Sequence, residues 1–132
     1  MGTLAKGSPW RVLVVDDYED AADVFADAVR AHGHLVRTAH DGFEALAMTA
    51  EFEPDLVFLD IGLPGMDGYE VARRMRQATR GRDLVLVAVT GYSARADERR
   101  SLDAGFDLHL AKPVDVTSLP RLLDSERPAA RH

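Results

Sequence analysis

The sequence predicts an α/β fold in which a doubly wound parallel sheet carries helices on both of its faces. Two observations support this prediction. Five short apolar runs recur along the chain, and the stretches between them space their apolar residues by three and four positions, as amphipathic helices do. Such alternation of strand and helix is typical of parallel sheets joined by right-handed crossovers. A chain of 132 residues is long enough for one domain with one core.

The first apolar run predicts a central strand, which a helix and an edge strand follow. Residues 12–15 (Val-Leu-Val-Val) lack polar alternation, which favours a strand buried on both faces. From Asp20 the spacing becomes helical, and we expect Gly33 to end the helix. Residues 35–39 include two polar side chains, which favour an edge or less buried strand. The apolar stripe expected on the first helix consists of Ala21, Val24, Phe25, Ala28, Val29 and His32.

The next segment predicts a helix, a buried strand and a structured loop. The Asp41-Gly42 turn starts a helix that runs to about Glu51, and Pro54 stops it. Residues 55–60 form the third strand, and a loop rich in glycine and proline leads into the third helix. The apolar positions of that helix are Val71, Ala72 and Met75. Its arginines are expected on a solvated face, with an acidic partner as the alternative; they are Arg73, Arg74 and Arg76.

The fourth strand–helix pair combines the most apolar strand with the least apolar helix. Residues 84–89 form the strand. Ser93 is expected to cap the helix and Gly105 to end it, with few core contacts besides Ala96 and Leu102. A helix so weakly anchored is a candidate moving part.

The end of the chain predicts a fifth strand and a short helix. Residues 108–111 form the strand, and Pro113 follows it. The last helix carries Leu119, Leu122 and Leu123, with Pro120 in its first turn. We therefore expect an N-terminal extension over residues 1–9, one domain over 10–124 and a polar tail over 125–132.

Composition excludes several classes of function. The formal net charge of −6 argues against direct nucleic-acid binding, which relies on clustered lysine and arginine. The chain has no cysteine, so disulfides, thiol nucleophiles and cysteine-bound zinc are excluded. No apolar run approaches the roughly 20 residues that span a membrane, and we recognise no secretory signal, so we expect a cytoplasmic location.

Four of the apolar runs end on residues that can handle a phosphoryl group. These residues are Asp16 and Asp17, Asp60, Thr90, and Lys112. In an open parallel sheet, the carboxyl ends of the strands meet at one crevice where ligands bind. Three carboxylates, a hydroxyl and an ammonium are therefore expected to share one pocket.

The chemistry of this set points to metal-assisted phosphoryl transfer. Adjacent carboxylates at Asp16 and Asp17 repel one another unless a cation neutralises them, and oxygen ligands favour Mg²⁺ or Mn²⁺. Asp60 can act as a nucleophile and form an acyl phosphate. Lys112 can then pair with a phosphoryl oxygen or with Asp60 itself, and Thr90 can donate a hydrogen bond to another phosphoryl oxygen. Taken singly, an acidic pair is more often a helix start, a threonine a turn former and a lysine a surface charge.

The sequence around these residues resembles the receiver domain of bacterial two-component response regulators, from about residue 11 to residue 124. The matching segments are 12–17 (VLVVDD), 56–68 (LVFLDIGLPGMDG), 87–91 (VAVTG) and 104–113 (AGFDLHLAKP). These motifs are most similar to those of receiver domains in single-domain response regulators and hybrid kinases. The resemblance implies a flavodoxin-like sheet of strand order 2-1-3-4-5.

The resemblance also implies a role for each site residue. Asp60 becomes the phosphoacceptor, Thr90 the switch hydroxyl and Lys112 the phosphate partner, with a cis Lys112-Pro113 bond. The implied ligands of Mg²⁺ are Asp17 directly, Asp16 mainly through water, Asp60 and the backbone carbonyl of Gly62. The phosphoryl donor would be a histidine on a sensor kinase or phosphotransfer protein. Phosphorylation would change the surface of the fourth helix, fifth strand and last helix, which a downstream protein or a second copy reads.

Four neighbouring positions are expected to modulate the switch. His109 stands where many receivers have an aromatic residue that swings inward, and a partly exposed strand histidine is the plainer interpretation. Gly62 and Tyr92 are expected to influence how fast water attacks the phospho-aspartate, and Gly91 to keep space beside Thr90. Two other functions stay open: a metal-dependent phosphohydrolase, although Ile61 and Gly62 supply no acid–base carboxylate, and a scaffold without phosphate turnover.

Overall fold

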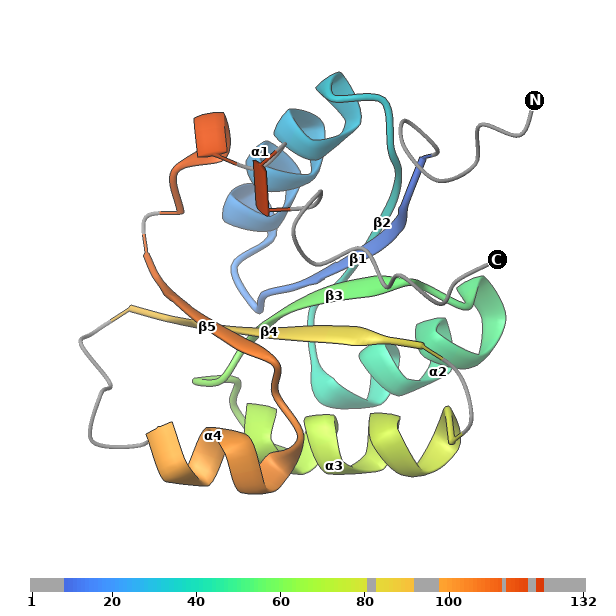
Figure 1. Ribbon diagram of the computed structural model, residues 1–132, viewed down its shortest axis with the longest axis vertical. Coiled ribbons are helices and arrows are strands. Elements are labelled where there is room, and N and C mark those ends of the chain that lie inside the picture. The colour runs from blue at the N-terminus through green and yellow to red at the C-terminus, as the bar shows by residue number, and fades with distance from the viewer. Residues whose placement is uncertain (1–8, 81–82, 92–97, 113, 119–120, 123–132) are drawn as a thin grey trace.

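The computed structural model describes residues 9–80, 83–91, 98–112, 114–118 and 121–122. Its centre is a five-stranded parallel sheet of order β2-β1-β3-β4-β5 (Figure 1). This order and the α/β class confirm the sequence prediction. The strands are β1 (Arg11–Val15), β2 (Leu35–Ala39), β3 (Leu56–Asp60), β4 (Val85–Thr90) and β5 (Leu108–Ala111). The helices are α1 (Glu19–Ala31), α2 (Gly42–Phe52), α3 (Gly68–Ala78) and α4 (Glu98–Ala104), and a short 3-10 helix spans Val116–Ser118.

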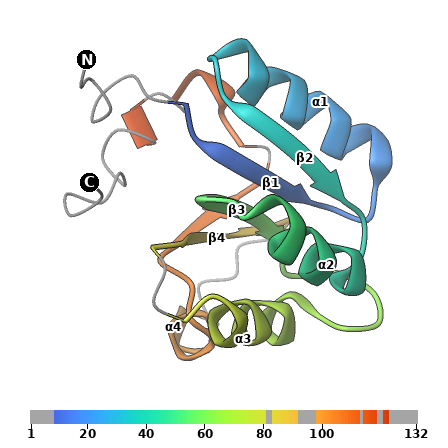
Figure 2. The ribbon, with the colours of Figure 1, turned by 90° about the vertical axis from the view of Figure 1, so that its right-hand side faces the viewer.

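The helices form a layer on each face of the sheet. In Figures 1 and 2, α1 lies on one face, whereas α2, α3 and α4 lie on the other. Successive residues of a strand point to opposite faces, so Leu13 joins the core under α2 and α3 while Val12 joins the core under α1. In the second core, the rings of Phe25 and Phe58 meet edge to face at 4.8 Å.

The three central strands are buried, as their continuous apolar runs predict. All six residues of β4 are buried, and so are four of the five in β1 and in β3. In β2 the side chains of Leu35 and Arg37 are exposed, which confirms its expected edge position.

Aspartates begin two of the helices that lead away from the carboxyl edge of the sheet. Asp41 caps α2 by accepting the backbone N–H of Glu44 at 2.7 Å, and Asp67 caps α3 by accepting that of Glu70 at 3.0 Å. Gly33 follows α1 with a φ of +93°, a conformation that a glycine adopts without strain. Local capping thus places the helix starts close to where the sequence predicts them.

The apolar stripe predicted for α1 is right for Val29 and for Phe25, which packs against the same core, but wrong for Val24. The buried side chains of α1 are Ala22, Ala26 and Val29, whereas Val24 is 71% exposed. The helix is rotated about its axis so that Ala22 and Ala26 lie against the sheet and Val24 faces solvent. Periodicity predicts that a helix has an apolar face, but contacts with the sheet determine which edge of that face is buried.

The predicted anchor of α4 is also wrong. Leu102 is 70% exposed, and the buried contacts come from Ala104 at the end of the helix and from Phe106 beyond it. The Phe106 ring lies edge-on to Tyr69 of α3, with 6.2 Å between the ring centroids. Helix α4 is therefore attached mainly through its last turn. The predicted cap Ser93 and the predicted contact Ala96 fall outside the described residues.

The arginines of α3 have different roles. Arg73 and Arg74 both pair with Glu70 on the solvent side, which lowers the pKa of that glutamate, the Arg74 bond contributing most. Arg76 instead donates to the backbone carbonyls of Leu84 and Gly105 and to the Asp107 carboxylate. The expectation of a solvated face fits Arg73 and Arg74 but is wrong for Arg76, which ties α3 to the residues just before β4 and just before β5.

The region after β5 is only partly described. Leu122 packs against the core under α1, and the Asp115 carboxylate accepts from Thr117 at the start of the 3-10 helix. Leu119, Pro120, Leu123, the tail and all but the last residue of the N-terminal extension lie outside the described residues. Within the described part of the chain, no helix has the length and apolarity needed to cross a membrane.

Candidate functional site

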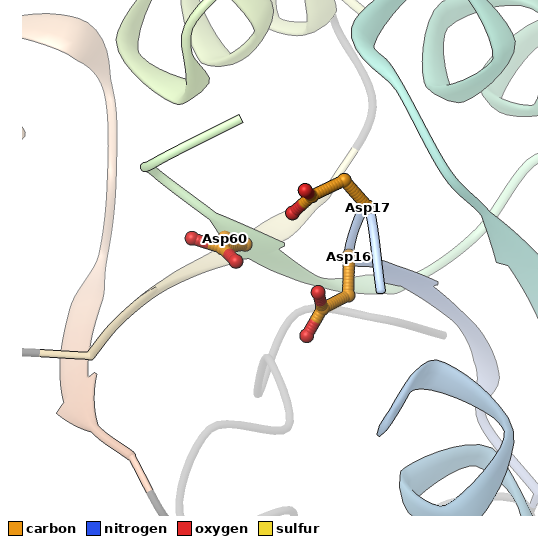
Figure 3. Close-up of side chains that lie close together, drawn as sticks. All are labelled: Asp16, Asp17 and Asp60. Atoms are coloured by element: carbon orange, nitrogen blue, oxygen red, sulfur yellow. The ribbon is translucent and has the colours of Figure 1, made fainter. Parts of the chain in front are cut away.

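Three carboxylates meet where β1 and β3 end. Figure 3 shows Asp16 and Asp17 after β1 beside Asp60 at the end of β3, with the Asp17 carboxylate directed toward Asp60. One oxygen from each of the three lies within 4.8 Å of the others. The side chains of Asp16 and Asp60 are only 11% and 12% exposed. The parallel pairing of β1 with β3 brings these residues to one edge of the sheet.

The turn after β1 is fixed by hydrogen bonds of Asp16. Its backbone N–H donates to the carbonyl of Ala39 at 3.0 Å, which extends the pairing with β2. Its carboxylate Oδ1 accepts the backbone N–H of Tyr18 at 3.0 Å, which leaves Oδ2 facing the site. Asp16 is therefore held by the fold before any ligand arrives.

Asp60 has a different partner on each carboxylate oxygen. Oδ1 accepts the backbone N–H of Gly62 at 2.8 Å, and Oδ2 accepts from the ammonium of Lys112 at 3.0 Å. Ile61 donates its backbone N–H to the carbonyl of Val89 at 3.1 Å, so β3 stays paired with β4 just past Asp60. These contacts fix the plane and position of the carboxylate.

Gly68 lets the loop after β3 fold back against Asp60. A Cβ atom on Gly68 would lie 2.4 Å from the Cα of Ile61 and 2.9 Å from the Asp60 carbonyl oxygen. Only glycine fits this approach, because such distances are far below van der Waals contact. The sequence marks Gly68 as part of a structured loop, but the close backbone approach has no sequence signal of its own.

Lys112 bridges the two most buried carboxylates. Its Nζ lies 3.1 Å from Asp16 Oδ2 and 3.0 Å from Asp60 Oδ2, and its backbone N–H donates to the carbonyl of Thr90 at 2.7 Å. Partial burial lowers the pKa of Lys112, but the hydrogen bonds to Asp60 and Asp16 together outweigh burial, so this pKa lies above its usual value. The ammonium is therefore charged at neutral pH.

Thr90 lies at the same edge of the sheet. It ends β4, is 8% exposed, and comes one residue after Val89, which is the register partner of Asp60. The structure thus brings to one edge the five residues at which the four apolar runs end. A nucleophilic carboxylate, a charged ammonium, a hydroxyl and two further acids are together suited to receive a phosphoryl group.

Comparison with known proteins decides the family. The sequence model of the response regulator receiver domain matches residues 12–124. This chain belongs to the response regulator receiver domain family. It has the receiver fold, and a phosphorylatable role in two-component signalling fits it.

Individual relatives agree with this assignment. The polar-differentiation response regulator DivK of Brucella anthropi is 32% identical over 117 residues, covering 89% of this chain and 93% of DivK. The response regulator PleD of Caulobacter vibrioides is 38% identical over 109 residues, covering 83% of this chain but 24% of PleD. A CheY-like receiver domain structure from Methanospirillum hungatei matches with a TM-score of 0.81 and 29% identity, covering 90% of this chain and 94% of that one.

The acidic pocket of this receiver domain fits a divalent metal ion. Mg²⁺ binds oxygen ligands at about 2.1 Å, so ligands on opposite sides of the ion lie about 4.2 Å apart. The three carboxylate oxygens lie within 4.8 Å of one another, which is close to this spacing. Hard oxygen donors are also the type that Mg²⁺ and Mn²⁺ prefer. The residues present therefore match the size and chemistry of such an ion.

The modulating positions of the receiver domain differ in how much space surrounds them. A Cβ on Gly62 would touch Asp60 Oδ1 at an ordinary 3.4 Å, and a Cβ on Gly91 would meet none of the described residues within 4 Å. His109 is half-buried on β5 opposite Ala88, which agrees with a partly exposed strand histidine. Tyr92 and Pro113, with its expected cis bond, lie outside the described residues.

Sequence reasoning missed an apolar cavity beside the acidic pocket. It measures about 630 Å³, and Asp16, Asp60 and Lys112 contribute to its lining. Its apolar wall includes Tyr18 and Val24, which are 64% and 71% exposed. Val24 was assigned to the inner face of α1, and only the rotation of that helix shows that it borders the site.

Proposed function

We propose that this receiver domain is a switch that takes a phosphoryl group from a phosphohistidine onto Asp60. The observation that supports this best is the pair of contacts to Asp60 Oδ2 and Oδ1, from the Lys112 ammonium and the Gly62 N–H. They hold a nucleophilic carboxylate in a fixed orientation beside two further acids. The phosphoryl donor would be a sensor kinase or a phosphotransfer protein.

The transfer forms one bond and breaks another. An oxygen of Asp60 attacks the phosphorus, the phosphorus–nitrogen bond of the donor breaks, and the imidazole leaves with its electron pair. The product is an acyl phosphate. Lys112 can follow the negative charge from the carboxylate to a phosphoryl oxygen, because its long side chain already reaches Asp60.

Asp16, Asp17, Asp60 and the Gly62 carbonyl would hold Mg²⁺. The bound ion would supply positive charge that offsets the charge of the phosphoryl oxygens. Asp17 is the exposed member of the three acids, so an ion arriving from solvent would reach its carboxylate first. We assign Asp16, which the Tyr18 N–H already orients, to bind mainly through water.

Phosphorylation would then change a surface that partners read. The Thr90 hydroxyl would bind a phosphoryl oxygen and draw the end of β4 toward Asp60. Helix α4 follows β4 in the chain and is attached mainly through Ala104 and Phe106, so it can shift at low cost. The surface of α4, β5 and the chain after it would bind a downstream protein or a second phosphorylated copy.

The same pocket would also return the switch to its resting state. Water attacks the phosphorus of the acyl phosphate and releases inorganic phosphate, which restores the Asp60 carboxylate. Gly62 has no side chain to shield the phosphorus, which favours access of water. Tyr92, Gly91 and His109 would set how long the phosphorylated state lasts.

The test is intact-mass analysis after incubation with acetyl phosphate. We expect a single phosphoryl adduct that requires Mg²⁺ and is lost in Asp60→Asn. Asp103→Asn, which removes an exposed acid on α4, serves as the matched control and should be phosphorylated like the wild type. An adduct that persists in Asp60→Asn would contradict the assignment. So would no adduct from acetyl phosphate or from a phosphorylated cognate kinase.

A further inference from the structure

A hollow lined by cationic side chains lies at the amino end of β2, the opposite end of the strands from the acidic pocket. It measures about 340 Å³, near the lower limit of about 300 Å³ for small-molecule pockets. Arg11, Arg30, Arg37 and His34 line it together with Phe52. Among the described residues, the lining includes no carboxylate, although the whole chain has 22 acidic and 16 basic residues.

Two of the guanidinium groups are held by backbone carbonyls. Arg11 donates through Nε and Nη2 to the carbonyl oxygen of Phe52, at 2.9 and 2.5 Å. Arg30 donates through Nη2 to the carbonyl of Val36 at 3.1 Å, and through Nη1 to the exposed Asp27 at 3.1 Å. A carbonyl orients a guanidinium without cancelling its charge. Both groups are thus pre-positioned; the charge of Arg11 stays available to an anion, while that of Arg30 is partly offset by the exposed Asp27.

Arg37 adds a charge that no described acid neutralises. Its guanidinium carbon lies 5.1 Å from the centre of the Phe52 ring, and that of Arg11 lies 4.5 Å from the same centre. In the described part of the chain, Arg37 has no hydrogen bond or ion pair. Two like charges gathered at one ring repel each other, and an anion between them would relieve that repulsion.

We propose that this hollow binds a small anion that carries a phosphate group. The guanidinium fork matches the oxygens of phosphate in pairs, and arginine is the residue best suited to such bidentate binding. Three arginines around a hollow of this size suit one or two phosphate groups. This inference does not depend on phosphorylation of Asp60, because it concerns the other end of the sheet.

The test is titration of the full chain with inorganic phosphate, pyrophosphate and ADP, each in separate samples containing EDTA. EDTA removes divalent ions, so phosphate binding at the acidic pocket is suppressed. Backbone amide NMR signals locate the site, and the three ligands distinguish an inorganic anion from a nucleotide. We expect saturable shifts at Leu35, Val36 and Arg37 with at least one ligand.

Two variants make the test specific. Arg37→Gln removes the unpaired charge and is expected to weaken binding about tenfold, with thermal unfolding unchanged. Arg73→Gln removes one charge from α3, where Arg74 still pairs with Glu70, and is expected to change affinity less than about twofold. Equal weakening by both variants would indicate diffuse attraction of charge and overturn the proposal. Absence of saturable shifts at β2, or shifts centred on Asp60 and Lys112, would overturn it as well.

Discussion

Lys112 supplies one positive charge to two carboxylates that are almost buried. Asp16 and Asp60 both lie within 3.1 Å of its Nζ. If the ammonium were removed, the carboxylates of Asp16, Asp60 and Asp17 would lie close together without the positive charge that Lys112 supplies. In the absence of a divalent ion, this residue therefore has a structural role in addition to its proposed one.

We expect Lys112→Met to lower the free energy of unfolding of the metal-free protein by about 1 kcal/mol near neutral pH, a modest value because the lysine side chain is 36% exposed. The raised pKa of Lys112 fixes the sign of the pH dependence. The stabilisation by the Lys112 ammonium is complete below the pKa of an unfolded lysine, about 10.4, and it is lost as the pH rises through the higher pKa of the folded protein. Urea unfolding of both proteins at about pH 8 and about pH 11 measures this.

The gap between wild type and Lys112→Met should therefore narrow at high pH. Lys6 is the only other lysine in the chain, so Lys6→Met is the control for general alkaline effects. A gap of the same size at both pH values would show that the lost stability comes from packing of the lysine chain instead of its charge.

Gly68 and Gly91 allow a matched comparison of two glycines near the site. A Cβ on Gly68 would meet the backbone of Ile61 and Asp60, whereas a Cβ on Gly91 would meet no atom of the described part of the chain within 4 Å. We expect Gly68→Ala to destabilise the fold by about 1–3 kcal/mol, as overpacking does, and Gly91→Ala to change stability by less than about 1 kcal/mol. Thermal unfolding checks both, and equal effects would refute the steric argument.

At the scale of elements, Arg100 connects helix α4 to the start of α3. The Arg100 guanidinium lies 4.1 Å from the centre of the Tyr69 ring, and its Nη2 lies 3.4 Å from the carboxylate of Asp67. Asp67 also caps α3 through its other oxygen. Arg100 therefore connects α4 to the end of the loop that follows Asp60, and its contacts oppose any shift of α4.

Arg100→Met should make α4 open more readily. A partly exposed cation–π contact and an exposed ion pair together contribute about 1 kcal/mol, so amide hydrogen exchange in α4 should rise by about fivefold. Arg80→Met, at an exposed position after α3, is the control and should leave α4 unchanged. If exchange in α4 stays the same in Arg100→Met, the buried Ala104 and Phe106 alone hold the helix.

The elements also show what a single sequence can and cannot predict. The strands follow from apolar runs, which are local patterns in the sequence. Their order follows from the resemblance to the receiver family, whose members share one fold. The orientation of a helix is not local: Val24 and Leu102 lie at apolar positions of their helices, yet both are mostly exposed because the sheet and α3 select other residues. The Arg76 contacts likewise join residues 29 and 31 positions apart, which no spacing rule reveals.

The candidate site was predictable to a similar extent. Each of the four strand ends has a chemically distinctive residue, so the parallel topology alone was enough to group Asp16, Asp17, Asp60, Thr90 and Lys112. The sequence also predicts that Lys112 can pair with Asp60, but its second contact, to Asp16, depends on the reach and rotamer of one lysine and has no sequence signal. The roles of these residues in phosphoryl transfer remain predictions for the mass measurement proposed above.

At the scale of the whole molecule, charge is separated along the strands. The carboxyl edge of the sheet gathers three acids around one lysine, and the amino edge of β2 gathers three arginines and a histidine. Charge held together at one edge destabilises the folded state until a ligand of opposite sign binds. The stability of the whole domain should therefore report on binding at the acidic pocket.

Mg²⁺ should raise the melting temperature, and EDTA should reverse the rise. At about ten times its dissociation constant, an ion that binds only the folded state adds about 1.4 kcal/mol, or several degrees for a domain of this size. Asp17→Asn separates binding from general salt effects, because it removes a proposed ligand and also relieves repulsion. We expect this variant to equal or exceed the wild type in EDTA but to gain little from Mg²⁺, while Asp103→Asn gains as much as the wild type. Equal gains in all three proteins would show that Mg²⁺ acts away from the three acids.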